Sequence, residues 1–439
     1  MAVHELAGTK VRPEDYIDLD AMTRAYHSIH PDAADPHQQV RFGTSGHRGQ
    51  AQSGSFTADH VAAITQAVCN FRQEFGADGP LFVGADTHYL SKLAFETVLS
   101  VLAANKVTAY VDADGDFVPT PSVSRAILRF NDHRKEHVAD GLILTPSHNP
   151  PEHGGIKYNP TTGGPAGSEM TKAIETEANR LLAGHNKDVQ MIPYEEAAQS
   201  DFVVPYDYKG LYVAELASIL DMEAIRDANL PILVNALGGS GMNYWHRISE
   251  RYHLNLSFVN DTYDPQFTFM NYDHDGKVRM DCSSAYVMSA VTGQAADYRL
   301  ILANDPDYDR FGIVCGTDGM ITANAFLTVA AHYLMTHRHF EGWALPKLSS
   351  RRICWPGRLR SSAYRFMKSP SALSISGPFM KKGKSLSPAK KVPAPPSSLK
   401  TAASGRPIRT ASSSACWLRK STPLRENRRW LTMRNSVLN

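Results

Sequence analysis

At 439 residues, of which 42% are hydrophobic, the chain is long enough to bury sizeable cores and is expected to form two or more domains. It has no run of about 18 apolar residues and no charged-then-apolar leader, so neither a membrane span nor a secretory signal is indicated, and the expected location is the cytoplasm. The five cysteines are scattered and lack C-x-x-C spacing, which argues against a disulfide framework or a zinc site.

The net charge of +2 conceals a division along the chain. Residues 351–439 contain 20 Lys and Arg against one acidic residue, whereas the first 350 residues contain 26 basic and 43 acidic residues. This tail also has 16 serines, nine prolines and no sustained helical or alternating pattern. Its composition is typical of a basic, disordered segment.

From Leu81 onward, strand-like and helix-like segments alternate. The first round contains a strand in LFVGAD, a helix opened by Ser91, a strand in VTAYVDA, a helix over residues 122–130 and a strand in GLILTP. Residues 170–184 predict an amphipathic helix, and residues 194–208 a connecting segment. This rhythm predicts a mostly parallel sheet with helices on both faces.

A second round repeats the pattern. It contains strands in LPILVNALGGSG, LNLSFVND and YRLILAND and helices over residues 242–252 and 283–291, and a third round starts at NAFLTVAAHYLM but is not completed. The predicted fold is therefore α/β, with tandem three-layer α/β/α domains on mixed, mostly parallel sheets, then an incomplete third domain and the basic tail. The predicted divisions are residues 1–200, 201–320, 321–350 and 351–439.

The first stretch with chemical content is RFGTSGHRG, which supplies three glycines beside Arg48. Glycines let backbone N–H groups approach an anion closely, and an arginine can bind phosphate through two parallel hydrogen bonds. The pattern is weak by itself. LGGSG at residues 237–241 is weaker still and is interpreted as a packing turn.

The stretch LILTPSHNPPEHGGIKYNP places Ser147 directly after an apolar strand, among Pro146, Pro150 and Pro151. Prolines fix their own φ angles and favour extended shapes for the residues before them, so this loop should be stiff. A stiff loop at the end of a strand is a good place to present a hydroxyl group. The alternative is a proline-rich turn in which the serine has no role.

In NDPDYDRFGIV, three carboxylates follow an apolar strand at every second position: Asp305, Asp307 and Asp309. Carboxylates this close repel one another unless a hard cation neutralises them, and oxygen-rich sites suit Mg²⁺. An EF-hand calcium loop would require glycine and glutamate where Arg310 and Gly316 stand. The remaining alternative is an acidic turn solvated at the surface.

A rigid serine, a magnesium site and a glycine-arginine loop together predict phosphoryl transfer. The motifs FGTSGHRG, TPSHNPPEHGGIKY and NDPDYDR, in this order and separation, resemble the α-D-phosphohexomutase superfamily and, within it, the bacterial phosphoglucomutases. GADTHYLS, GDFVPTPSVS and YNPTTGGPA add to the resemblance, which covers roughly residues 1–340.

The resemblance implies a role for each matching residue. Ser147 would be the phosphoserine, and its phosphate would hold Mg²⁺ together with Asp305, Asp307 and Asp309. Arg310 would contact phosphate at the active site. Arg48 and Lys157 would lie beside the transferring phosphoryl group, where one or both help to move the proton of the attacking hydroxyl, with His148 as a further helper.

The implied reaction interconverts α-D-glucose 1-phosphate and glucose 6-phosphate through glucose 1,6-bisphosphate, which is both intermediate and activator. The partners would be hexose phosphates, with neither nucleic acid nor membrane involved. The reaction needs a site closed to water, because water would hydrolyse the phosphoserine.

The chain departs from the family after about residue 340. The family's G-E-E-S-A-G-A-S and R-P-S-G-T-E loops, which grip the sugar and the second phosphate, are absent. PAKKVPAPPSS, at residues 388–398, can be encoded by codons whose other reading frame gives G-E-E-S-A-G-A-S-F-L. We therefore expect a frame slip between residues 342 and 354, which sequencing of the encoding DNA would test, and consequently impaired turnover.

Three other functions remain open. A phosphomannomutase or phosphoglucosamine mutase would use the same serine and acidic loop, and its sugar preference would lie in the absent loop. A truncated remnant without catalysis would keep Ser147 unphosphorylated. The basic tail could instead be a nucleic-acid-binding arm, whose association would weaken with salt.

Overall fold

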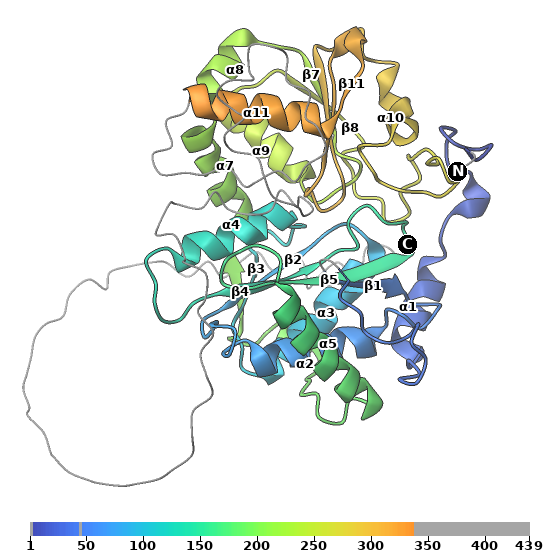
Figure 1. The fold of residues 1–439 in the computed structure, drawn as a ribbon, viewed down its shortest axis with the longest axis vertical. Coiled ribbons are helices and arrows are strands. Elements are labelled where there is room, and N and C mark those ends of the chain that lie inside the picture. The colour runs from blue at the N-terminus through green and yellow to red at the C-terminus, as the bar shows by residue number, and fades with distance from the viewer. Residues whose placement is uncertain (1–2, 44–45, 338–439) are drawn as a thin grey trace, which may run out of the picture.

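The computed structural model describes residues 3–43 and 46–337. Within them the chain forms two α/β bodies, each built on one sheet, as Figure 1 shows. We call the body on the six-stranded sheet the first domain and the body on the five-stranded sheet the second domain. The basic tail and the region of the expected frame slip lie outside the described residues, so those predictions stay untested.

The first domain has the strand order β1-β5-β4-β2-β3-β6. The strands β2, β3, β4 and β6 run parallel, whereas β5 is antiparallel to β4 and β1 is antiparallel to β5. Their bounds are β1 His47–Gln50, β2 Leu81–Ala85, β3 Ala109–Asp112, β4 Asp140–Leu144, β5 His153–Asn159 and β6 Val203–Tyr206. The helices are η1 Pro13–Asp15, α1 Leu19–Ser28, α2 Ala58–Phe71, α3 Tyr89–Ala104, α4 Thr120–Asn131, α5 Ser168–Ala183, α6 Tyr194–Ala197 and α7 Tyr208–Ile219.

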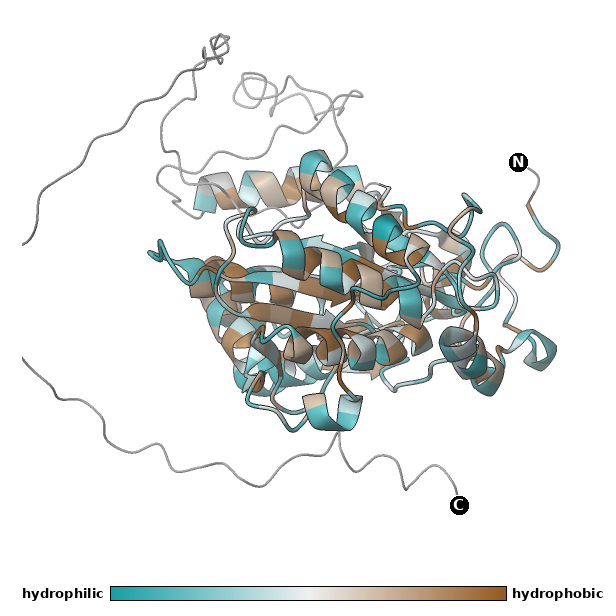
Figure 2. Cartoon of the chain, turned by 90° about the horizontal axis from the view of Figure 1, so that it is seen from below, coloured by the Kyte–Doolittle hydropathy of each residue, from teal (hydrophilic) through white to brown (hydrophobic). Residues whose placement is uncertain are grey.

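Alternating strand residues divide the packing between the two faces of this sheet. In β4, Leu142 and Leu144 join a core with α1, α2, α3 and α5, while Ile143 between them joins the core of α4 and α7. Successive side chains of a strand point to opposite faces, so a strand covered by helices on both sides is apolar throughout. Figure 2 shows these strands as a hydrophobic band between helices with hydrophilic outer faces.

The second domain repeats the arrangement with the order β11-β10-β9-β7-β8. The strands β7, β8 and β9 are parallel, and β10 and β11 continue the sheet antiparallel. The strands are β7 Ile232–Asn235, β8 Leu256–Val259, β9 Leu300–Asn304, β10 Phe311–Val314 and β11 Met320–Ile321. The remaining elements are α8 Met222–Ala228, α9 Met242–Tyr252, α10 Ala285–Thr292, η2 Gly316–Asp318 and α11 Ala323–His337.

The predicted fold class is confirmed for the described residues, with two differences in detail. Residues 194–208 contain β6, the edge strand of the first sheet, and so do more than connect the domains. The helix expected to open at Ser91 begins at Tyr89 instead. The Ser91 hydroxyl donates to Asp86 at 2.7 Å and is therefore not a helix cap.

Contacts between the two domains are direct. The Ser122 hydroxyl on α4 lies 2.9 Å from the Tyr244 hydroxyl on α9, and both residues are buried. At the other side, the N-terminal segment crosses to the second domain, where Val11 joins the core of β7 and α10. No described helix is both long enough and apolar enough to cross a membrane.

Candidate active site

The loop between β4 and β5 presents Ser147. The backbone N–H of Thr145 donates to Gly155 O at 2.9 Å, and that of Ser147 donates to Thr145 Oγ1 at 2.7 Å. Ser147 has φ +68° and is 3% exposed. A non-glycine residue in the left-handed region is uncommon, and such strain gathers at functional sites. This geometry favours a role for the serine over the alternative of an incidental turn residue.

The acidic loop, residues 305–310, joins β9 to β10. Asp305 and Asp307 are fully buried, so the alternative of a solvated surface turn is wrong. Tyr308 at the tip has φ +62°, and the N–H of Arg310 donates to Asp305 Oδ1 at 2.9 Å, which closes the turn. Ligand oxygens of the three aspartates lie within 4.8 Å of one another.

The serine loop and the acidic loop meet across the domain boundary. Ser147 Oγ donates to Asp305 Oδ2 at 2.9 Å. Lys157 Nζ, on β5, lies 2.6 Å from Asp307 Oδ2 and 3.1 Å from Asp309 Oδ2. The predicted serine, lysine and three aspartates, which come from both domains, therefore lie at one place.

The charges at this place are unevenly balanced. Burial and the neighbouring charges of Asp307 and Asp309 raise the pKa of Asp305 well above its usual range. Burial acts in the same direction on Asp307, but the adjacent Lys157 ammonium overrides it and lowers the pKa of Asp307. Lys157 pairs with Asp307 and Asp309, Arg310 Nε lies 4.0 Å from Asp309 Oδ1, and Asp307 Oδ1 is buried without a hydrogen-bond partner among the described residues.

An oxygen-only donor set with an orphaned carboxylate oxygen fits a hard divalent cation of the Mg²⁺ type. Buried polar atoms are normally satisfied, so the orphaned Oδ1 of Asp307 is most simply explained as a ligand atom. The residues present therefore fit the predicted metal.

The other predicted residues surround the serine loop. Arg48, on β1, donates from Nε to Pro146 O at 3.2 Å. His148 Nδ1 lies 3.4 Å from Ser147 Oγ, and burial together with the charge of Arg310 lowers the pKa of His148 to about 4. Arg310 has a 45% exposed side chain whose Nη1 lies 3.7 Å from Asp281. All of the predicted site residues are thus brought together.

Sequence reasoning missed three further contacts of this site. The Thr120 hydroxyl, at the start of α4, donates to Asp307 Oδ2 at 2.8 Å. Ser240 donates from both N and Oγ to Pro306 O, each at 2.8 Å. The pair Asp86 and His88 lies under the serine loop. GDFVPTPSVS, LGGSG and GADTHYLS contain these residues, but nothing in the three stretches alone reveals which loop each would approach.

The LGGSG segment packs against the acidic loop. A Cβ atom on Gly241 would lie 2.2 Å from the Tyr308 ring, and one on Gly239 would lie 2.9 Å from Pro306 Cα. Side chains are excluded at both positions, so the prediction of a packing turn is confirmed.

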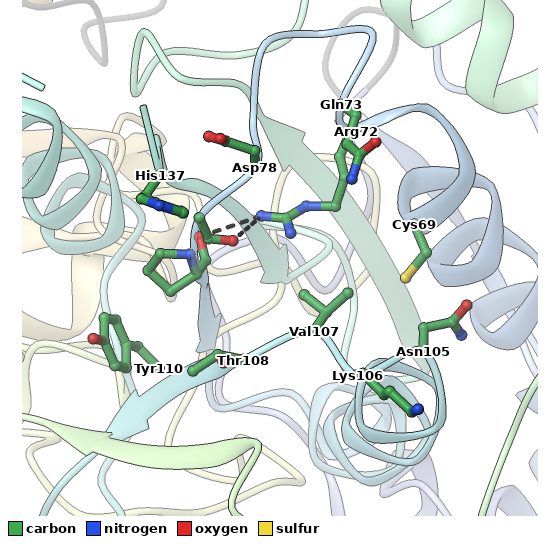
Figure 3. Close-up of a pocket in the computed structure, with 12 residues that line it drawn as sticks. Cys69, Arg72, Gln73, Asp78, Asn105, Lys106, Val107, Thr108, Tyr110 and His137 are labelled. Carbon is green, nitrogen blue, oxygen red and sulfur yellow. Dashed lines mark hydrogen bonds between the residues drawn. The ribbon is translucent and has the colours of Figure 1, made fainter. Parts of the chain in front are cut away.

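A separate polar pocket of about 450 Å³ lies at the N-terminal ends of β2 and β3. The serine loop follows the C-terminal end of the parallel strand β4, so the pocket is at the opposite end of the strands. Figure 3 shows Arg72 in this pocket with its guanidinium directed at the backbone of residues 79–80, where it donates to Gly79 O at 2.7 Å. The same group pairs with buried Asp140 at 2.6 Å. The buried arginine is therefore already neutralised within the fold.

Comparison with known families agrees with this architecture. Residues 39–184 match the model for phosphoglucomutase/phosphomannomutase, alpha/beta/alpha domain I, and residues 211–319 match the model for domain II. The first match contains the serine loop, and the second contains the acidic loop.

Individual relatives point the same way. A phosphoglucomutase of Komagataeibacter xylinus is 42% identical over 78% of this chain, and the match spans 61% of that relative's length. A Thermus thermophilus protein described as a phosphomannomutase gives a TM-score of 0.55 at 24% identity, covering 67% of this chain and 61% of its own. The open form of Paramecium pp63/parafusin gives 0.53 at 20% identity, covering 67% and 55%. With both domain models matched in order, the chain belongs to the phosphoglucomutase/phosphomannomutase family.

Proposed function

We propose that this protein interconverts α-D-glucose 1-phosphate and glucose 6-phosphate through a phosphoserine at Ser147 and glucose 1,6-bisphosphate. The observation that carries the proposal is the 2.9 Å contact between Ser147 Oγ and Asp305 Oδ2, made by a serine in a left-handed turn. A nucleophilic hydroxyl directed into a cluster of carboxylates is of use when the group it carries is a phosphate shared with a cation.

Asp305, Asp307, Asp309 and the phosphate on Ser147 would hold Mg²⁺. When bound, the ion neutralises negative charge on the phosphoryl group as the group moves. The orphaned Oδ1 of Asp307 and the raised pKa of Asp305 support this assignment, because a cation would ligate the unbonded oxygen and stabilise a carboxylate that burial and two like charges destabilise.

The protein's own side chains then divide the remaining work. In the first half-reaction the bond between phosphorus and Ser147 Oγ breaks and a bond to the substrate's free hydroxyl oxygen forms. The hydroxyl proton leaves to a base, and Ser147 Oγ takes up a proton. The second half-reaction returns the other phosphate to Ser147 by the reverse steps.

The charge states suggest who does what. Burial alone would lower the pKa of Lys157, but the neighbouring Asp307 and Asp309 raise it. Lys157 therefore stays an ammonium that can hold the phosphoryl oxygens or supply a proton. His148, with its pKa lowered to about 4, is neutral near pH 7, so its ring can take a proton only transiently and acts as a weak base. Arg48 would hold the phosphoryl group from the β1 side, and the half-exposed Arg310 would bind the substrate's phosphate.

Because the chain spans 61% of the length of its bacterial relative, the turnover of the whole enzyme is part of the proposal. The divisions expected near residues 200 and 320 leave the serine loop and the acidic loop in the first two domains, so the residues for phosphoryl transfer would be kept. Loss of the sugar-gripping loop would weaken the grip on the substrate. Impaired turnover is therefore expected. A phosphomannomutase or phosphoglucosamine mutase is the alternative, since the described residues include no sugar-selecting loop of the predicted type.

The test measures the two half-reactions separately. Purified protein with Mg²⁺ is incubated with glucose 1,6-bisphosphate, and phosphorylation of Ser147 is followed by intact mass and peptide mapping, beside a Ser147→Ala control. Phosphoprotein is then mixed with the 1-phosphates of glucose, mannose and glucosamine. Transfer of the phosphate from Ser147 to glucose 1-phosphate alone supports the proposal. Transfer to mannose 1-phosphate or glucosamine 1-phosphate selects the alternative. Folded protein that never gains a phosphate at Ser147 contradicts both and favours a remnant without catalysis.

A further inference from the structure

A fully buried pair, Asp86 and His88, lies under the serine loop. Both stand in the short turn between β2 and α3, and both are 0% exposed. Asp86 accepts four hydrogen bonds: Oδ1 from the backbone N–H of His88 at 3.0 Å and from Ser91 Oγ at 2.7 Å, and Oδ2 from His88 Nδ1 at 2.9 Å and from Thr145 Oγ1 at 2.5 Å. Only a carboxylate offers acceptors on both oxygens for so many donors.

This pair holds the serine loop from two sides. On one side, Asp86 accepts from the Thr145 hydroxyl, which in turn accepts from the Ser147 backbone N–H at 2.7 Å. On the other side, His88 Nε2 lies 2.9 Å from Asn149 O. Ser147 stands between the two anchored residues.

The anchors explain how a strained residue is retained. A single left-handed residue other than glycine persists only where its surroundings over-determine it. Ser147 takes φ +68°, and from there its Oγ reaches Asp305 of the second domain. Without the two anchors, residues 145–149 could relax toward the extended shapes that the flanking prolines favour, and the hydroxyl would leave the acidic loop.

We propose that Asp86 and His88 are positioning residues that hold Ser147 in the left-handed conformation from which it faces the acidic loop. The consequence for phosphoryl transfer rests on the function proposed above. The conformational part does not, because it concerns the loop in the protein without any phosphate. Reactivity of a misplaced nucleophile falls steeply with small displacements, so the pair should affect turnover more than substrate affinity.

Two isosteric substitutions separate the two ring nitrogens of His88. His88→Asn places an amide nitrogen near the position of Nδ1, so it keeps a donor for Asp86 and loses the bond to Asn149. His88→Gln places one near Nε2 and keeps the bond to Asn149. His60→Asn is a matched control, because His60 is also 0% exposed and its Nε2 faces a backbone carbonyl, Gln38 O, at 2.7 Å.

The first readout is amide hydrogen exchange of the peptide containing residues 145–149. His88→Asn should speed exchange there by about tenfold or more, while His88→Gln retains most of the protection and His60→Asn leaves this peptide unchanged. Unchanged exchange in His88→Asn would overturn the proposal. This readout stands even if wild-type protein never becomes phosphorylated, an outcome that would defeat the proposed function alone.

The second readout is the rate at which phosphate reaches Ser147 from glucose 1,6-bisphosphate. With His88→Asn the maximal rate should fall by about tenfold to a hundredfold with an unchanged half-saturating concentration, and His88→Gln should restore most of it. A rate equal to that of wild type, or an equal loss in His60→Asn, would mean that the pair only stabilises the domain.

Discussion

The serine loop and the acidic loop occupy equivalent places in two sheets whose central strands have the same order, yet they are held in different ways. In the orders β3-β2-β4-β5-β1 and β8-β7-β9-β10-β11, each loop joins the last parallel strand to its antiparallel neighbour. Within its own domain the serine loop is held by hydrogen bonds to Asp86, His88 and Gly155, and the second domain adds the Met280 N–H, which donates to His148 O at 3.2 Å. The acidic loop receives its countercharge, Lys157, from the other domain.

This difference indicates what kind of structural support each of the two loops requires. A strained but neutral loop can be set by hydrogen bonds within one domain, since no net charge has to be balanced. A cluster of three carboxylates, two of them fully buried, cannot, because each uncompensated charge is costly away from water. The charge balance of the acidic loop therefore depends on the domain boundary and on a cation.

The largest expected effect comes from removing the countercharge. Lys157→Met should lower the free energy of unfolding by about 3–5 kcal/mol in a chelator, because it leaves Asp307 buried and unpaired. Urea denaturation measures this. Adding Asp307→Asn to the same chain should recover much of the loss, and a double variant as unstable as the single one would show that Lys157 acts through packing alone.

Removing one of the repelling charges should act in the opposite direction. Asp305→Asn should stabilise the protein in a chelator, since the pKa of Asp305 is raised by burial and by its two acidic neighbours. It should also abolish the stabilisation by Mg²⁺, which for wild type is about 2.7 kcal/mol at a hundred times the dissociation constant. Thermal unfolding with and without Mg²⁺ measures both effects.

Asp112→Asn is the matched control for the cation. Asp112, Asp114 and Asp116 form another acidic cluster with ligand oxygens within 4.8 Å, but Lys209 pairs with Asp114 at 3.2 Å and with Asp116. Asp112→Asn should leave the response to Mg²⁺ unchanged. If it removed the response instead, the ion would bind at that cluster and the proposed metal site would be wrong.

A smaller effect tests the hydrogen bond that crosses between the domains. Thr120→Val keeps the shape but removes the hydroxyl that donates to Asp307, and a bond to a buried charged group is worth about 1.5–3 kcal/mol. Thr97→Val is the control, because Thr97 is equally buried at 4% exposure and its hydroxyl partner, Tyr26, is neutral. Equal losses of unfolding free energy in the two variants would contradict a special role for Thr120.

The fold was predictable where the pattern is local. The helix predicted over residues 242–252 is α9. The strands predicted in LFVGAD and GLILTP are β2 and β4, because a strand buried on both faces is an apolar run with turn residues at its ends. The strand β6 was missed. Its residues are only partly buried and include Pro205, so the segment lacks the apolar signal of an interior strand.

The site was predictable only in part, because some of its contacts join residues that are far apart in the sequence. Ser147 and the three aspartates stand in motifs whose spacing carries the chemistry. Thr120 acts on Asp307 from 187 positions away in the sequence, and Asp86 reaches Thr145 across 59. Such contacts depend on how helices and sheets approach one another, which no local pattern of charge or hydrophobicity encodes.

A pH-dependent effect tests the hydrogen bonds of a neutral histidine, His47, at the start of β1 in the first domain. Burial and the nearby His60 lower the pKa of His47 to about 3, while its Nε2 lies 2.9 Å from Ser55 O. The folded-state pKa lies below the unfolded value of about 6.5, so this contribution to stability is complete above that value and is lost as pH falls toward 3. Within that window His47 should cost about 1.4 kcal/mol of unfolding free energy per pH unit. His47→Gln, which keeps a donor for Ser55 and does not titrate, should flatten the pH dependence by that amount in urea denaturation at about pH 7 and about pH 5. Parallel profiles for the two proteins would mean that His47 takes up a proton in the folded state, and the neutral, hydrogen-bonded support inferred for β1 would then have to include a charge.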